Sequence, residues 1–228
     1  MTVGDDTPWT AADELAALLA GCRASHRTLL DVVGPLDEAA ARRSSRLEHW
    51  TVGHVLTHLA RNAASHTRML RAALVGDAVE QYAGGGEERA EAIEAGAGRS
   101  APELVADVVQ TTAELEATWD AMTPSAWGGH GLSRGRPWPC RTIPWLRWRE
   151  VEIHLVDLGV GYEPHRWPAA YVARELPLAL ATLSDRVVDD DQRRHLLAWL
   201  LGRADAPGEV HLEAWGSRPD HYFKDVAG

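Results

Sequence analysis

The chain has 228 residues, of which 45% are hydrophobic and 25% charged, and its 23 basic and 33 acidic residues give a formal net charge of −10. This length and composition fit one large globular domain, or a medium domain with a small appendage. The negative charge and the absence of a basic run argue against a nucleic-acid binder, because such proteins follow phosphates with clustered lysine and arginine. No stretch reaches the ~18 apolar residues of a membrane span, so we expect no membrane contact and a cytoplasmic location.

The two cysteines, Cys22 and Cys140, are too few for a disulfide framework and form no CxxC pair. Neither has the histidine context expected of a cysteine nucleophile. We therefore expect two reduced structural thiols and no thiolate zinc site.

The first part of the chain predicts two long helices. Thr10 and Asp13 form an N-cap with an acid three residues on, and leucines then recur at helical spacing until Gly34-Pro35 stops the helix. A second helix is predicted to begin near Thr51 and to run to about Gly76.

Two further long helices are predicted after a glycine-rich loop. A short helix over Glu87 to Gly96 precedes the third long one, which starts with Ser100 as its N-cap and ends at Thr123-Pro124. Residues 124–141 read as a loop with room for one short strand pair, and the fourth helix follows Pro144. Four long helices of similar length favour a helical bundle.

A second unit is predicted to start near Pro164. Helices are expected around Ala169 to Val188 and Asp191 to Gly202, and Glu209 to Trp215 alternates like a short strand. The chain thus divides into a mainly α bundle over residues 1–163 and a small C-terminal α/β domain over residues 164–228.

The fourth helix carries an ionisable stripe on a largely apolar circumference. Glu150 and His154 lie four residues apart and stack on one face, with Arg147 and Asp157 on the same stripe. Buried ionisable groups must be paired, solvated or bound to a metal. The spacing alone is a weak metal signal, and an ion pair between Glu150 and an arginine explains it equally well.

The second helix offers histidines that differ in orientation. His58 and Asn62 fall at the flank of its apolar stripe, whereas His54 lies farther round and is expected to be solvated. His66 falls within the stripe and competes with His58 for an inward role. A lone flank histidine is more often a hydrogen-bonded core residue, but with Glu150 and His154 it completes the open three-ligand set of catalytic zinc.

The segments HWTVGHVLTHLARNA and REVEIHLVDLG together resemble the mycothiol-dependent maleylpyruvate isomerases, a family of the DinB-like metal-dependent bundle superfamily. The resemblance covers about residues 10–162. It implies a DinB-like four-helix bundle in which His58, Glu150 and His154 bind the metal. It also implies an arginine in an EER segment, here Arg89, and one after WLLG, here Arg203, as carboxylate-binding candidates.

The C-terminal domain departs from the family pattern because strand sequence is missing before the helix that precedes Arg203. This abbreviation affects the expected substrate binding more than the expected metal site. Asp157 is a candidate for orienting a ligand histidine, although a polar residue at a helix end is equally compatible.

The resemblance implies zinc, or another divalent metal, and mycothiol as the thiol cosubstrate. It predicts an isomerase that converts maleylpyruvate, or a similar unsaturated dicarboxylate, from cis to trans by reversible thiol addition. Two alternatives stay open: a mycothiol S-transferase acting on another electrophile, and a non-catalytic metal-binding bundle. The expected partners are a small organic acid and a thiol, and the expected state is a monomer or homodimer.

Overall fold

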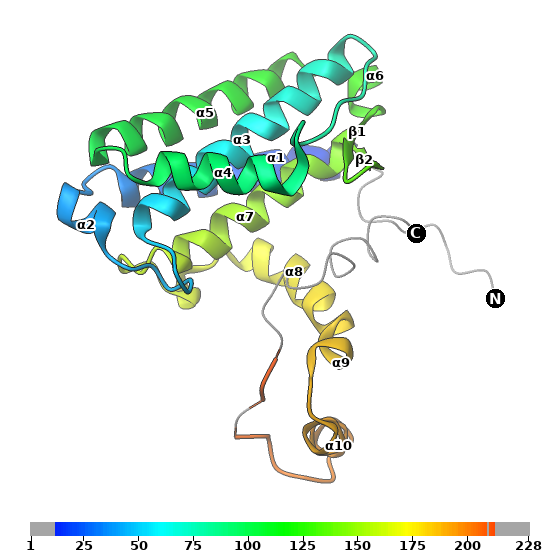
Figure 1. The fold of residues 1–228 in the computed structure, drawn as a ribbon. Coiled ribbons are helices and arrows are strands. Elements are labelled where there is room, and N and C mark those ends of the chain that lie inside the picture. Colours follow the sequence, from blue (N-terminus) through cyan, green and yellow to red (C-terminus); the bar gives the residue numbers. More distant parts are fainter. Residues whose placement is uncertain (1–11, 209, 213–228) are drawn as a thin grey trace. The chain divides into compact units, whose positions relative to one another are not determined.

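The computed structural model describes residues 12–208 and 210–212. The chain divides into two compact units, with the boundary between Trp167 and Pro168. Figure 1 shows the long helices of the first unit side by side. They are α1 (Ala12–Val33), α3 (Val52–Leu74), α5 (Ala101–Ala121) and α7 (Ile143–Asp157). Helix α3 packs against α5 and α7, and α1 packs against α7 and α5. The predicted four-helix bundle is confirmed.

The helices begin where the sequence supplies caps. The Ser100 amide donates to the Glu103 carboxylate at 2.9 Å, in a capping box at the start of α5. At the start of α3, the Thr51 amide donates to His54 Nδ1 at 3.1 Å. His54 is therefore used as a cap, and its side chain is 17% exposed rather than fully solvated. The predicted cap at Thr10 lies outside the described residues.

The bundle core lies where α3, α5 and α7 meet α1. It is filled by fully buried aliphatic side chains that repeat at helical spacing, such as Leu56 and Leu59 on α3, Leu104 on α5 and Leu155 on α7. This packing holds α3 and α7 against each other, which fixes the separation of the polar groups they carry.

Short elements fill the connections of the first unit. They are α2 (Glu38–Arg42), α4 (Gly85–Ala97), α6 (Pro124–Trp127), β1 (His130–Ser133), β2 (Arg136–Pro139), η1 (Cys140–Thr142) and η2 (Pro164–Arg166). The expected strand pair is present: β1 and β2 are antiparallel, with His130 opposite Pro139. Arg134 and Gly135 form the two-residue turn between the strands. Both have positive φ, 52° and 74°, as such a hairpin turn requires.

Helix α4 lies close against α3 because both helices carry a glycine at the contact. A side chain at Gly53 would overlap the Ala97 carbonyl oxygen, and one at Gly96 would overlap the Thr57 side chain. This close approach brings Arg89 of α4 to the face of α3 that carries His58.

In the second unit, the described residues form α8 (Ala169–Ala181), α9 (Leu183–Arg186) and α10 (Asp190–Leu200). The single helix predicted over Ala169 to Val188 is divided at Thr182, whose φ of −95° and ψ of −2° depart from regular α-helical values. The predicted strand falls mostly outside the described residues, although Leu212 forms a β-bridge with Val187.

Among the helices of the described residues, none is both long and apolar enough to cross a membrane.

Candidate metal centre

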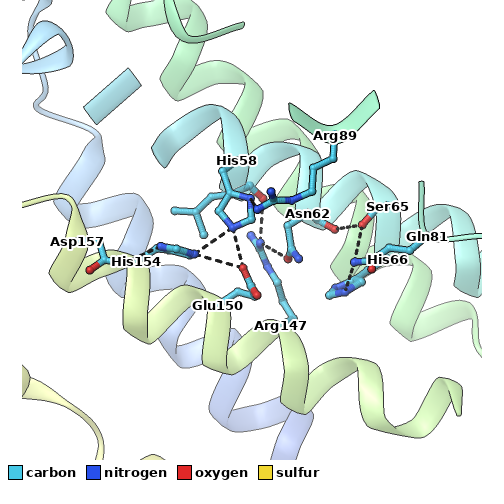
Figure 2. Close-up of polar contacts among 11 residues, drawn as sticks. His58, Asn62, Ser65, His66, Gln81, Arg89, Arg147, Glu150, His154 and Asp157 are labelled. Carbon is cyan, nitrogen blue, oxygen red and sulfur yellow. Dashed lines mark hydrogen bonds and ion pairs between the residues drawn. The ribbon is translucent and has the colours of Figure 1, made fainter. Parts of the chain in front are cut away.

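Three side chains from α3 and α7 converge in the middle of the bundle (Figure 2). His58 Nε2 lies 2.8 Å from Glu150 Oε2 and 3.0 Å from His154 Nε2. His154 Nε2 lies 3.4 Å from the same Glu150 oxygen. One ligand atom of each residue falls within 4.8 Å of the other two. The fold therefore brings together the three groups proposed from the sequence, and His58 is 92 residues from Glu150 in the chain.

Helix geometry explains how the three groups meet. Glu150 and His154 are one turn apart on α7, so both side chains leave the same face. The neighbouring carboxylate, Glu152, faces elsewhere: it is fully buried and accepts hydrogen bonds from Ser25 and Tyr162. Of Glu150 and Glu152, Glu150 is therefore the carboxylate that faces α3.

The outer nitrogens of both histidines have partners of their own. His154 Nδ1 donates to Asp157 Oδ2 at 2.9 Å, which orients the ring with Nε2 towards the convergence point. Arg89 Nη2 lies 3.0 Å from His58 Nδ1 and, being a guanidinium nitrogen, must be the donor. The structure thus puts Asp157 and Arg89 in contact with the two histidines.

The three groups titrate very differently. Burial lowers the pKa of His58 to about 4, with His154 adding to the effect. Burial also opposes charge on His154, but the Asp157 and Glu150 carboxylates outweigh it and raise its pKa to about 9. Burial would raise the pKa of Glu150, yet hydrogen bonds from His154 and His58 hold it well below its ordinary value. Without a metal, the centre is therefore an ionised carboxylate beside one protonated imidazole.

The donor set fits a divalent metal ion such as zinc. Tetrahedral zinc with bonds of ~2.0–2.1 Å to nitrogen and oxygen separates its ligands by about 3.3 Å. Of the three ligand-to-ligand distances, 3.4 Å matches that value, and 2.8 and 3.0 Å are shorter. Two imidazoles and one carboxylate also form the open three-ligand set typical of catalytic zinc sites.

A buried arginine lies one turn from Glu150 on the same helix. Arg147 is 0% exposed, and its Nη1 donates at 2.9 Å to both the Leu59 carbonyl oxygen and Asn62 Oδ1. Its Nε donates at 3.1 Å to His26 Nε2. The sequence placed Arg147 on the stripe with Glu150. It gave no signal that His26 on α1 would contact Arg147, because the two residues are distant in the chain.

The remaining histidine candidate, His66, is buried but does not join the triad. It is 1% exposed, two turns beyond His58 on α3, and its Nε2 lies 3.5 Å from Gln81 Nε2. His58, whose ring stands 5.8 Å from that of Trp50, takes the position against Glu150. Both histidines are therefore buried, and of the two it is His58 that lies against Glu150.

The remaining candidates from the sequence are Arg203 and the two cysteines. Arg203 belongs to the second unit, where it follows the glycine that ends α10; its amide donates to the Ala198 carbonyl oxygen at 2.7 Å and its side chain is exposed. Its role in substrate binding stays a prediction. Cys22 and Cys140 are both free and buried, and burial raises the pKa of both thiols.

The chain is similar to known proteins over the bundle. Residues 22–159 match the family model of the mycothiol maleylpyruvate isomerase N-terminal domain. The crystal structure of a mycothiol-dependent maleylpyruvate isomerase is 27% identical, with a TM-score of 0.69, over 76% of this chain and 71% of that one. A histidine-to-alanine mutant of such an isomerase matches over the same shares at 26% identity. No curated protein sequence gives a significant match. With more than half of its length matched by the family model, the chain belongs to the mycothiol maleylpyruvate isomerase N-terminal domain family.

Proposed function

We propose that this protein is a mycothiol-dependent cis–trans isomerase that acts on maleylpyruvate or a similar unsaturated dicarboxylate. In this proposal, His58, Glu150 and His154 hold one divalent metal ion, zinc being the first choice. The observation that carries the proposal is the convergence of these three ligand atoms within 4.8 Å, in a chain of this family.

When bound, a divalent metal would lower the pKa of the thiol and supply it as a thiolate near neutral pH. The thiolate sulfur adds to one carbon of the cis double bond, and the electron pair moves onto the conjugated carbonyl oxygen. The former double bond is now single and rotates. Return of the electron pair reforms the double bond as trans and expels the thiolate, so the thiol is regenerated and nothing is oxidised or reduced.

The chain's own residues would position and balance these charges. Asp157 accepts from His154 Nδ1 and keeps that ring oriented with Nε2 towards the centre. The same carboxylate stabilises the protonated form of His154. Metal binding therefore requires His154 to release a proton.

Arg89 is proposed to bind a carboxylate of the acid. An imidazole that coordinates through Nε2 carries its proton on Nδ1, and Nδ1 of His58 then no longer accepts from Arg89. The guanidinium, which now lies 3.0 Å from that nitrogen, would become available to a carboxylate beside the reacting atoms.

The test is an assay of cis–trans conversion of maleylpyruvate by the metal-loaded protein, with and without mycothiol. We expect conversion only when both metal and mycothiol are present. Arg89→Gln should raise KM for the acid by roughly 10–100-fold with unchanged metal content, whereas the exposed Arg71→Gln control should behave as wild type. Thiol consumption without a trans product would contradict the isomerase and favour an S-transferase.

A further inference from the structure

Polar side chains continue beyond the candidate metal centre along the contact between α3 and α7. His58, Asn62 and His66 follow one another at intervals of one turn on α3, and Arg147, Glu150 and His154 form the facing row on α7 (Figure 2). The triad uses one end of these two rows. The other end, with Arg147 and His66, has no part in the chemistry described so far.

Arg147 is a buried cation with no direct carboxylate partner among its hydrogen bonds. Its Nε and Nη1 donate to three neutral acceptors, on His26, Leu59 and Asn62. These bonds tie α7 to α1 and α3 and account for two of its three nitrogens. Nη2 is buried and has no hydrogen-bond partner among the described residues.

His66 presents a second buried donor without a partner in the described part of the chain. An amide nitrogen only donates, so His66 Nε2 accepts from Gln81 Nε2 and the proton of the neutral ring lies on Nδ1. His66 Nδ1 is buried and unpartnered. Burial, together with the nearby Arg147 charge, lowers the pKa of His66 to about 3, so the ring is neutral at physiological pH.

Two buried donors without partners, on the facing helices α7 and α3, call for an acceptor. Leaving a buried donor unpaired costs on the order of 1–3 kcal/mol, and more for a charged group. A purely structural role for Arg147 explains its three bonds to α1 and α3, but it explains neither its Nη2 nor His66 Nδ1. A divalent ion bound by two neutral imidazoles and one carboxylate would add a further net positive charge nearby. Such a region favours an anion with oxygen acceptors.

We propose that Arg147 Nη2 and His66 Nδ1 form a carboxylate subsite next to the candidate metal centre. This inference rests on the proposed function and deepens it: the subsite would bind the carboxylate of the acid that Arg89 does not hold. A planar guanidinium edge and an imidazole N–H both donate in the directions that carboxylate oxygens accept.

The test measures binding of maleate, a cis dicarboxylate, and of its neutral diamide to the metal-loaded protein by calorimetry. The main variant is His66→Leu, which removes an unpartnered donor from a buried position. A subsite role predicts unchanged metal content, a melting temperature equal to or above wild type, and maleate binding weaker by about tenfold. Diamide binding should not change. A histidine retained only for packing or hydrogen bonding predicts lower stability with unchanged maleate affinity.

Arg147→Lys provides a second variant that keeps the charge but loses the planar fork, and it should also weaken maleate binding about tenfold or more. The exposed His130→Leu variant is the control. Unchanged maleate affinity in both variants, with metal retained, overturns the subsite while leaving the isomerase proposal intact. Wild-type protein that binds maleate no more tightly than the diamide overturns it as well. Failure of the wild-type protein to take up metal or to isomerise would instead be a failure of the proposed function.

Discussion

Replacing Asp157 with asparagine tests whether the carboxylate behind His154 controls the metal centre. Asp157 Oδ2 accepts from His154 Nδ1 at 2.9 Å, and the aspartate side chain is 17% exposed. Asparagine keeps the size and an oxygen acceptor but removes the charge. Loss of such a partner of a metal-binding histidine typically reduces metal affinity 10–100-fold.

The size of the effect should depend on pH. The pKa of His154 is about 9 because, against the burial of the ring, Asp157 and Glu150 favour its protonated form. At about pH 7, the metal must therefore displace a proton from His154. This competition weakens the apparent metal affinity by roughly 100-fold. Asp157→Asn lowers that pKa, so part of the lost affinity is recovered at about pH 7. Near pH 9.5, where the wild-type ring is already neutral, the full 10–100-fold loss should appear.

The assay is competition for zinc against a chelator of known affinity at both pH values, with the exposed Asp31→Asn variant of α1 as the control. We expect the ratio of wild-type to variant affinity to grow as pH rises. An Asp157→Asn protein that binds zinc as tightly as wild type near pH 9.5 would refute this account of Asp157. A loss of equal size at both pH values would refute the proton competition.

Two further predictions concern the scaffold of the site. Gly53→Ala should destabilise the protein by about 1–3 kcal/mol in thermal unfolding, because the new methyl group would overlap the Ala97 carbonyl oxygen where α4 meets α3; Gly98→Ala, which meets nothing within 4 Å, is its control, and equal melting temperatures would contradict the close approach. In the metal-free protein, His26 should contribute about 2 kcal/mol of stability that is lost as pH falls from about 6.5 to about 5. Burial, together with the Arg147 charge, lowers its folded-state pKa to about 4, so the unfolded chain takes up the proton first. Urea unfolding as a function of pH should show a shallower slope for His26→Gln, and an unchanged slope would argue against a neutral buried His26.

Local sequence signals predicted the helices of the bundle well because each one depends on neighbours in the chain. The capping pair of Ser100 and Glu103 sets the start of α5, and Thr51 is the N-cap at the start of α3. The break at Thr182 escaped the prediction, because apolar periodicity does not report a local departure of the backbone from α-helical angles.

The candidate site could be predicted only in part, because the contacts that complete it join residues far apart in the chain. The spacing of Glu150 and His154 shows that they share a face, but the selection of His58 over His66 depended on a resemblance and is visible only when α3 meets α7. The bond from Arg147 to His26 joins residues 121 positions apart, and no local pattern reports it. The placement of Arg89 against His58 likewise depends on how closely α4 approaches α3.

The most direct test of the central claim is the metal content of purified protein, compared with His58→Ala, Glu150→Ala and His154→Ala after identical chelation and reloading with zinc. The account predicts about one equivalent in the wild-type protein and a large loss in each variant, since removing one of three ligands leaves too few for a stable site. Full zinc retention in all three variants would contradict it.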